Sequence, residues 1–277
     1  MPELPEVETI RRGLQPVLSA GTVTEVEVRH PRMLRRQPVA SDFADRMEGS
    51  TIGKLGRIGK FLLIEVGDQG NTWVLHMGMS GRMEIAGHGT PEPVHTRVVI
   101  RTEAGQEVRM VDTRTFGFVA VYTPEELASS TIARLGPDAW TELPPASGSA
   151  DKMAGRRVAI KSLLLDQRFL AGLGNIYADE VLFGAGVQGT RPAGSLTTPE
   201  IQAIFNTIPK VLAEGLRHGG TSLDDLAYLL PDGRAGQHLD YLSVYGREGK
   251  PCRRCGSGIV REKINGRSSY SCVTCQT

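Results

Sequence analysis

The chain has 277 residues, a length that predicts two domains. Of these residues 40% are hydrophobic and 23% are charged, a composition typical of a globular protein. Its acidic, proline-bearing start is unlike a secretory signal and its apolar runs are too short to cross a membrane, so we expect a cytosolic protein. A formal net charge of +1 gives no bulk signal for a nucleic-acid partner.

The chain opens with MPELPEVETI, which predicts a helix that starts at Pro5. Proline suits the first helical position, and Glu6 in the first turn complements the positive end of the helix. Neither argument accounts for Pro2 and Glu3, which lie ahead of the helix where any flexible residue would serve. The opening therefore asks for a further explanation.

The first half of the chain has strand character. Alternating apolar stretches are separated by turn signals such as GDQGN, which predicts an antiparallel two-layer β domain over residues 1–135. We expect strands at 22–30, 60–66, 72–78, 96–102, 107–112 and 118–123.

The second half changes to a helical period. Residues 136–155 are rich in Pro, Ser, Ala and Gly and are interpreted as a linker, followed by a helical domain over 156–240. We expect helices at 156–167, 175–186 and 197–219, the last one broken or kinked at Pro209. The Gly-rich stretch from 219 to 238 is predicted to be mobile.

A tight turn joins the first two of these helices. It contains Gly172 and Gly174, and Asn175 is the expected N-cap of the second helix. Free N–H groups at such a terminus bind anions, and glycines let a phosphate approach closely. An ordinary helix hairpin with a good cap explains the same residues.

All four cysteines lie in the tail, residues 241–277, as two CxxC pairs sixteen residues apart. Four thiolates at this spacing favour a closed, structural zinc site over two disulfides or four free thiols in a cytosolic protein. Between the pairs, Asn265-Gly266 is a strong hairpin signal, so Arg267 is expected just past the hairpin tip. The predicted ligands are Cys252, Cys255, Cys272 and Cys275.

Charge is unevenly distributed along the chain. Residues 1–140 carry 16 Lys and Arg against 18 Asp and Glu, a net of −2, whereas residues 241–277 carry seven against two, a net of +5. The tail is therefore a compact basic module, as phosphate binding requires.

Together these stretches resemble the formamidopyrimidine-DNA glycosylases, bacterial base-excision-repair enzymes that remove oxidised purines. The resemblance runs in order along the whole chain and is carried by MPELPEVETIRRGL, GKFLL, HMGMSGRM, DTRTFG, LGPDA, IKSLLLDQRFLAGLGNIYADEVLF and VYGREGKPCRRCG…CVTC. It implies an α+β multidomain fold: an N-terminal antiparallel β-sandwich with flanking helices, a helix-two-turn-helix domain and a zinc-bound β-hairpin. It also implies a monomer that acts on damaged double-stranded DNA in the cytoplasm.

The resemblance gives the opening a purpose. Removal of Met1 would leave Pro2 with a free secondary amine, and an α-amino group titrates near pH 8, so part of it is neutral at physiological pH. Attack on a sugar C1′ yields an iminium ion, an electron sink for elimination of the phosphates. Glu3 would move protons at the sugar ring, and Glu6 would orient the site.

Other positions match by the same resemblance. Residues implied to grip phosphates around the lesion are Lys60, His76, Asn175 and Arg267. Residues implied to fill the space left by a flipped nucleotide are Met79, Arg114 and Phe116. Lys60 and Lys161 are counted with the catalytic residues, Lys161 because it matches a lysine that handles the oxidised purine, and Glu180 matches a base-pocket carboxylate.

Plainer interpretations stay open for several of these residues. His76 suits a hydrogen-bonded strand histidine, Met79 a core residue, Phe116 a hairpin aromatic and Lys161 a solvated helix lysine. The alternative functions are a glycosylase for oxidised pyrimidines, as in endonuclease VIII, and a non-catalytic zinc protein that binds damaged DNA.

Two departures from the family pattern concern lesion preference. Thr113 and Thr115 stand where the family usually has a proline and a second cation, and the stretch 219–240 is about two residues longer and more apolar than the usual lesion-capping loop.

Overall fold

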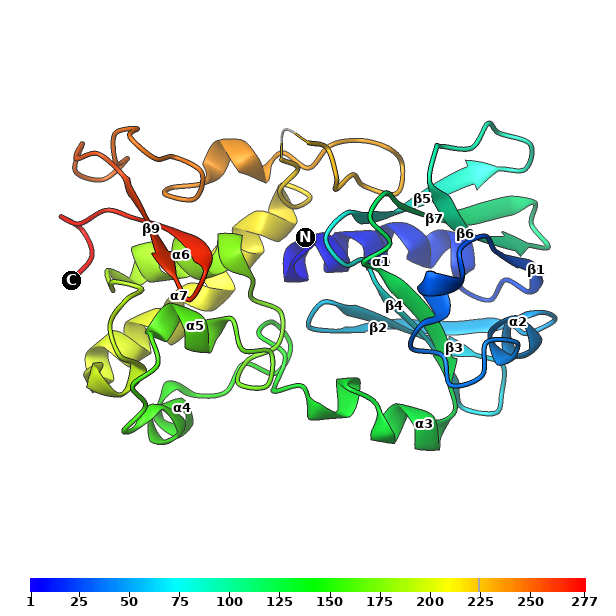
Figure 1. The fold of residues 1–277 in the computed structure, drawn as a ribbon, viewed down its shortest axis with the longest axis horizontal. Helices are drawn as coiled ribbons and strands as arrows, with labels where there is room; N and C mark the ends of the chain where they lie inside the picture. The colour runs from blue at the N-terminus through cyan, green and yellow to red at the C-terminus, as the bar shows by residue number, and fades with distance from the viewer. Residues whose placement is uncertain (224) are drawn as a thin grey trace. The chain divides into compact units, whose positions relative to one another are not determined.

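A computed structural model describes residues 1–223 and 225–277, which form two compact units (Figure 1). The first unit comprises Met1–Arg134 and Leu216–Leu239, and the second comprises Leu135–Gly215 and Asp240–Thr277. Residues 216–239, expected from the sequence to belong with the helices, therefore group with the N-terminal unit.

Hydrogen bonds explain this grouping. Thr221 N donates to Glu6 Oε1 at 2.7 Å, and Ile85 N donates to Pro231 O at 3.0 Å. Tyr228 is only 4% exposed and belongs to the hydrophobic core of the first unit. Parts of the stretch that was predicted to be mobile are thus anchored, and its residue 224 lies outside the described residues.

Two four-stranded antiparallel sheets build the first unit, ordered β1-β6-β7-β5 and β2-β3-β4-β8. Apolar side chains from both sheets and from one face of α1 share one core, which confirms the predicted β-sandwich. The strands are β1 (Val23–Val28), β2 (Ile52–Ile58), β3 (Phe61–Val66), β4 (Asn71–His76), β5 (Gly81–Gly87), β6 (Thr96–Thr102), β7 (Gln106–Asp112) and β8 (Phe118–Tyr122). The helices are α1 (Leu4–Leu18), η1 (Pro31–Leu34), α2 (Asp42–Met47), α3 (Pro124–Ser129) and η2 (Ile132–Arg134).

The six strands predicted from the sequence are present, and β2 and β5 are additional. Their sequences, IGKLGRI and GRMEIAG, hold glycines that weaken the strand pattern, and cross-strand pairing in the sheets stabilises them instead. At the chain start, Leu4 is the first helical residue and Pro5 the second, because Glu3 takes the N-cap position.

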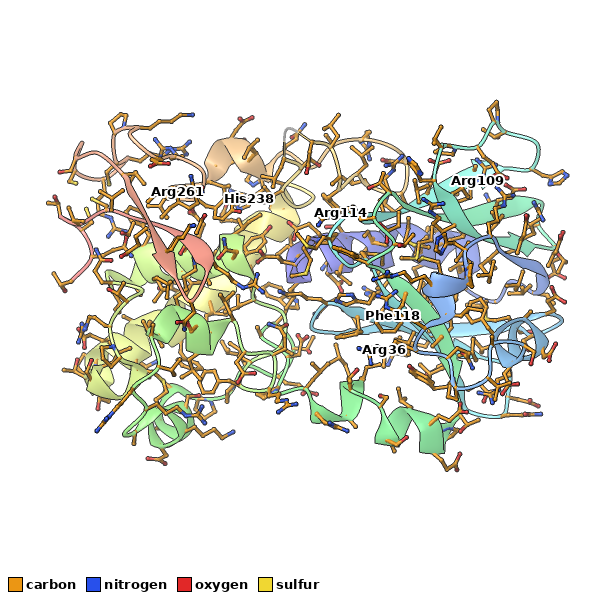
Figure 2. All side chains as sticks on the ribbon, in the orientation of Figure 1. Arg36, Arg109, Arg114, Phe118, His238 and Arg261 are labelled. Carbon is orange, nitrogen blue, oxygen red and sulfur yellow. The ribbon has the colours of Figure 1, made fainter. Side chains whose placement is uncertain are left out.

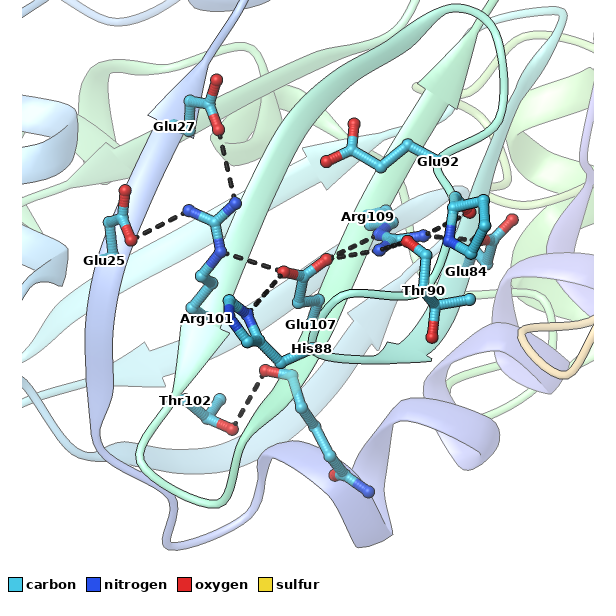
Figure 3. Close-up of polar contacts among 12 residues, drawn as sticks. Glu25, Glu27, Glu84, His88, Thr90, Glu92, Arg101, Thr102, Glu107 and Arg109 are labelled. Carbon is cyan, nitrogen blue, oxygen red and sulfur yellow. Dashed lines mark hydrogen bonds and ion pairs between the residues drawn. The ribbon is translucent and has the colours of Figure 1, made fainter.

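One face of the β1-β6-β7-β5 sheet carries an ion-pair network (Figure 3). Glu107 and Arg109 are two residues apart on β7 and share one face, while Val108 and Met110 enter the core. Burial raises the pKa of Glu107, but hydrogen bonds from Arg109 and Arg101 outweigh it and hold the pKa below its usual value. The network links β1, β6, β7 and β5 across this face of the sheet.

The second unit is mainly helical and carries a β-hairpin. Its elements are α4 (Ala146–Met153), α5 (Ile160–Leu164), α6 (Asn175–Ala185), η3 (Ala193–Ser195), α7 (Thr198–Arg217), η4 (His238–Tyr241), β9 (Val260–Ile264) and β10 (Arg267–Ser271), with α7 and η4 each crossing the boundary between the units by two residues. Asn265 and Gly266, with φ of 47° and 78°, form the two-residue turn between β9 and β10, as predicted.

Three expectations about this unit need correction. The predicted linker contains helix α4, and its Asp138 is 1% exposed and forms a β-bridge with Ala171. Helix α5 has five residues, shorter than the predicted 156–167. Helix α7 continues through Pro209, so the predicted break is absent, because tertiary burial of its apolar face compensates for the lost hydrogen bond. The alternative expectation of a kink at Pro209 stays a prediction. None of the helices formed by the described residues is both long and apolar enough to span a bilayer.

Candidate active site

The start of α1 is buried and tightly held. Glu3 and Glu6 are each 2% exposed, and Pro2 is also buried. The carboxylate of Glu6 accepts a hydrogen bond from Glu3 N at 2.8 Å and, through its other oxygen, one from Thr221 N at 2.7 Å. Two backbone donors on one carboxylate fix the position of Glu3 and of the residue before it.

Glu8 extends this arrangement along the helix. Its carboxylate binds Arg11, Arg12 and Arg57, at 2.9, 2.9 and 3.3 Å. Burial raises the pKa of Glu8, but the hydrogen bonds from Arg11 and Arg12 more than offset this effect and lower the pKa overall. Glu8 therefore stays ionised and ties α1 to β2.

Lys60 and His76 lie at neighbouring strand ends. Lys60 is 5% exposed in the two-residue turn between β2 and β3, where Gly59 has a φ of 55°. His76 ends β4, pairs with Phe61 and Phe118 on either side, and its ring lies 4.6 and 5.8 Å from theirs. The structure thus brings these two predicted phosphate-binding residues together.

His76 is a neutral donor. Burial lowers its pKa to about 4, and the positive charges of Lys60 and Arg35 add to this effect. Its Nδ1 accepts a hydrogen bond from Gly78 N at 3.1 Å, so the proton of the neutral ring is on Nε2. The ring can donate to an anion without carrying charge.

Met79, Arg114 and Phe116 lie on two loops of the first unit that meet at Gly78 and Phe116, and Figure 2 labels Arg114 on one of them. Met79 and Phe116 are 46% and 39% exposed, and the Arg114 guanidinium carbon lies 4.6 Å from the centroid of the Phe116 ring. The loops touch at Gly78, which has a φ of 61° and where a Cβ would lie 2.3 Å from the Phe116 carbonyl carbon. Only glycine permits this approach.

Asp112, which is fully buried, joins the same two loops. It accepts hydrogen bonds from Ser80 Oγ at 2.6 Å, Arg114 N at 3.1 Å and Gly117 N at 2.8 Å. The sequence offered no signal for this role, because an aspartate at a strand end is common and its partner Ser80 is distant in the chain. We call Met79, Arg114 and Phe116 the wedge residues from here on.

In the second unit, Lys161 is fully buried. Its Nζ lies 2.8 Å from Asp179 Oδ1 and donates to Ser268 O at 2.7 Å. Burial raises the pKa of Asp179 to about 6, although Lys161 opposes the effect. These contacts tie α5 and α6 to the hairpin. They do not test the role of Lys161 in handling the oxidised purine, which stays a prediction.

Asn175 differs from the expected N-cap, and Glu180 is held by backbone hydrogen bonds. The N-cap of α6 is Gly174, and Asn175 is its first helical residue, with Nδ2 donating to Ser268 O at 2.9 Å. Glu180 accepts backbone hydrogen bonds from Ser243, Val244 and Tyr245, while burial raises its pKa. Glu180 therefore anchors residues 243–245, and its base-pocket role remains a prediction without support from these contacts.

The four tail cysteines form a site for one structural zinc ion. Their sulfurs all lie within 4.8 Å of one another, with Cys252 and Cys275 at 4.0 Å and Cys255 and Cys272 at 3.4 Å. Sulfur–sulfur distances of this size suit a tetrahedral ion with Zn–S bonds of about 2.3 Å and exclude disulfides. Arg267 is exposed at the first position of β10, so the hairpin presents it to solvent as predicted.

Comparison with known proteins agrees with this architecture. Family models described as "Formamidopyrimidine-DNA glycosylase N-terminal domain", "Formamidopyrimidine-DNA glycosylase H2TH domain" and "Zinc finger found in FPG and IleRS" match residues 1–119, 135–226 and 249–277. A formamidopyrimidine-DNA glycosylase of Salinispora arenicola is 43% identical over 281 residues, covering 100% of this chain and 96% of the relative.

Solved structures are similar over the full length. The MutM (Fpg) protein of Thermus thermophilus has a TM-score of 0.88 and 36% identity, covering 99% of this chain and 98% of that one. Lactococcus lactis Fpg, in a complex with DNA that contains an abasic site, has a TM-score of 0.91 and 29% identity, covering 100% of both chains.

Removal of the metal should unfold the hairpin and leave the first unit intact. We expect one zinc per chain by atomic absorption, and chelation should increase hydrogen exchange in β9 and β10 while β3 stays protected, because the metal replaces a core in so small a module. The Cys255→Ser variant should lose the metal, and Val273→Ser, an exposed change beside the ligands, should keep it. Metal-free protein with a protected hairpin would contradict the assignment.

The titration of His76 should be visible in the free protein. NMR should give a pKa near 4, against about 6.5 in the unfolded chain, so the unfolded state binds the proton first and stability should fall as the pH drops from 6.5 to 4. The pKa difference sets an upper limit of about 3 kcal/mol on the unfolding free energy lost over this range. The actual loss should be smaller, because the His76 side chain is only half-buried.

The His76→Gln variant should flatten the pH dependence of the unfolding free energy in this window. The matched control, His88→Gln, changes a mostly exposed imidazole. A His76 resonance that titrates near pH 6.5 would show that the ring is not held neutral by its surroundings.

Proposed function

Because the chain belongs to the formamidopyrimidine-DNA glycosylase family, we propose that it is a bifunctional DNA glycosylase and abasic-site lyase that removes oxidised purines from duplex DNA. The observation that carries this proposal is the buried start of α1, where Glu6 fixes Glu3 beside Pro2. A protein that only binds DNA has no need of this arrangement.

Pro2 is the proposed nucleophile. Once Met1 has been removed, the lone pair of the Pro2 nitrogen attacks C1′ of the damaged nucleotide, the bond from C1′ to the base breaks, and the base leaves with its electron pair and takes up a proton. Loss of the amine proton and opening of the sugar ring give an iminium ion. A secondary amine reaches this cationic state without further protonation, and hydrolysis later frees Pro2.

Glu3 is the proposed proton-transfer group. Its carboxyl group donates a proton to the sugar ring oxygen as the ring opens and accepts one as the 3′ and then the 5′ phosphate are eliminated. Burial at 2% exposure keeps bulk water from competing for these protons. Glu6 contacts backbone N–H groups and therefore acts by holding Glu3 in place.

Phosphate contacts provide affinity in this proposal. Lys60 contributes charge and His76 a neutral Nε2–H donor, and both lie at strand ends of the first unit. Arg267 on the hairpin and Asn175 at the start of α6 are the proposed contacts from the second unit. Such contacts position DNA without reading its sequence.

The wedge residues are proposed to fill the space that a flipped nucleotide leaves in the base stack. Met79 and Phe116 offer exposed apolar surface beside the Arg114 guanidinium, as needed to fill a gap in the base stack and contact the opposing base.

We further propose that the protein acts as a monomer in the bacterial cytoplasm. Excision assays on duplexes with 8-oxoguanine, formamidopyrimidine or thymine glycol distinguish oxidised purines from oxidised pyrimidines.

Borohydride should trap the covalent intermediate. With a lesion or abasic duplex, reduction of the iminium should give a DNA–protein adduct at Pro2, because the amine bonds directly to C1′. Pro2→Gly should lose much of the adduct, acetylation of the terminus should abolish it, and Pro16→Ala, an exposed proline of α1, should behave like wild type. Full activity of protein that retains Met1 would overturn the assignment.

Arg267 and Arg114 should differ in what they recognise. Arg267→Ala should weaken binding to every duplex by a similar factor and reduce the salt slope by about one unit, as loss of a phosphate contact does. Arg114→Ala should cost about 1–3 kcal/mol, mostly in discrimination among opposing bases.

The measurement is affinity at several salt concentrations for duplexes that differ only in the base opposite the lesion. Lys263→Ala, a cation on the same hairpin, is the control for Arg267→Ala. Equal, base-independent losses for the Arg267 and Arg114 variants would make Arg114 another phosphate contact.

A further inference from the structure

Arg35, which follows η1, contacts the loop that carries two of the wedge residues. Its Nη2 donates to Phe116 O at 2.7 Å, and its Nη1 donates to Gly117 O and, at 3.0 Å, to Arg32 O. Its guanidinium carbon also lies 5.5 Å from the centroid of the Phe118 ring. Arg35 thus binds the main chain of a loop that is distant from it in the sequence.

The same loop holds a strained residue. Thr115, between Arg114 and Phe116, has a φ of 52°, a left-handed conformation that a β-branched side chain rarely adopts. Such strain persists only where surrounding contacts enforce it. Asp112 binds the backbone N–H groups of Arg114 and Gly117, and Arg35 binds the carbonyls of Phe116 and Gly117.

We propose that Arg35 is a positioning residue for opposite-base recognition: its hydrogen bonds to the 116 and 117 carbonyls hold Thr115 in its strained conformation and so keep Arg114 and Phe116 ready to enter the base stack. The inference rests on the proposed function of the wedge residues. Without the Arg35 bonds, Thr115 relaxes to negative φ, and the directions of the two neighbouring side chains change.

The planar guanidinium is essential to this role. Two N–H groups on one rigid fork reach two successive carbonyls, whereas a lysine ammonium is a point charge on a flexible stem. Arg35→Lys keeps the charge and loses the fork, so it separates positioning from simple attraction to phosphate. Arg36→Gln is the matched control, since Arg36 is the next residue, is exposed and carries the same charge.

The first readout is the fluorescence of 2-aminopurine placed opposite a tetrahydrofuran abasic analogue in a duplex. This fluorescence rises when the wedge residues enter the stack and the 2-aminopurine base loses its stacking contacts. The second is the ratio of kcat/KM for 8-oxoguanine opposite cytosine and opposite adenine. We expect Arg35→Gln and Arg35→Lys to lose most of the fluorescence rise. In both variants the ratio of the two kcat/KM values should fall about tenfold. Arg36→Gln should match wild type in both.

Two further measurements separate positioning from general damage to the fold. Borohydride trapping on a single-stranded abasic oligonucleotide, which has no opposing base, should be unchanged in Arg35→Lys, because this variant keeps the positive charge near His76. Thr115→Asn should restore the fluorescence rise in the Arg35→Lys background, because asparagine tolerates positive φ and keeps the loop shape without the clamp. Trp73, fully buried in the core of the first unit, reports whether each variant is folded.

The inference is overturned if Arg35→Lys retains the wild-type fluorescence and discrimination, if Arg36→Gln loses as much, or if trapping on single strands falls in parallel. If Arg35→Gln does not fold, Arg35→Lys with and without Thr115→Asn gives the result. A wild-type protein that raises 2-aminopurine fluorescence but excises nothing would contradict the proposed function alone, since the fluorescence series still tests Arg35.

Discussion

One buried carboxylate holds together the proposed catalytic end of the first unit. Glu6 accepts hydrogen bonds from Glu3 N and from Thr221 N, which are far apart in the sequence. The same bonds fix the start of α1 and draw residues 216–239 into the N-terminal unit. Loss of Glu6 would remove the acceptor of both N–H groups, which is costly in a buried site, so the chemistry proposed for Pro2 and Glu3 depends on a residue that need not touch substrate.

A second carboxylate organises the wedge in a similar way. Asp112 binds both loops that carry Met79, Arg114 and Phe116, and Gly78 lets the loops meet at main-chain distance. Arg35 completes the support from a third segment. In both places, exposed or reactive groups are held by buried polar groups bonded to main-chain atoms, which limits the conformational entropy that must be lost on DNA binding.

Local patterns predicted much of the candidate site. The two CxxC pairs and Asn265-Gly266 act over a few residues, so the zinc site and the hairpin could be inferred directly. The resemblance to a family pointed to Pro2 and Glu3 as candidate catalytic residues. Lys161 and Glu180 were harder, because a charged side chain on a helix has the same sequence pattern whether it faces solvent or a buried partner. Asp179 and the backbone of 243–245 decide between these possibilities.

The sequence by itself determined the β-sandwich, the helical segment, the cysteine ligands and the turn chemistry, because hydrophobic period, glycine and proline act within a few residues. Only the tertiary structure decided that Pro209 stays within a continuous helix, that β2 and β5 form despite their glycines, and that residues 216–239 pack on the first unit. It also decided the contacts from Thr221 to Glu6 and from Arg35 to Phe116. These outcomes depend on burial and on hydrogen bonds between distant segments, whose free energy no local pattern records.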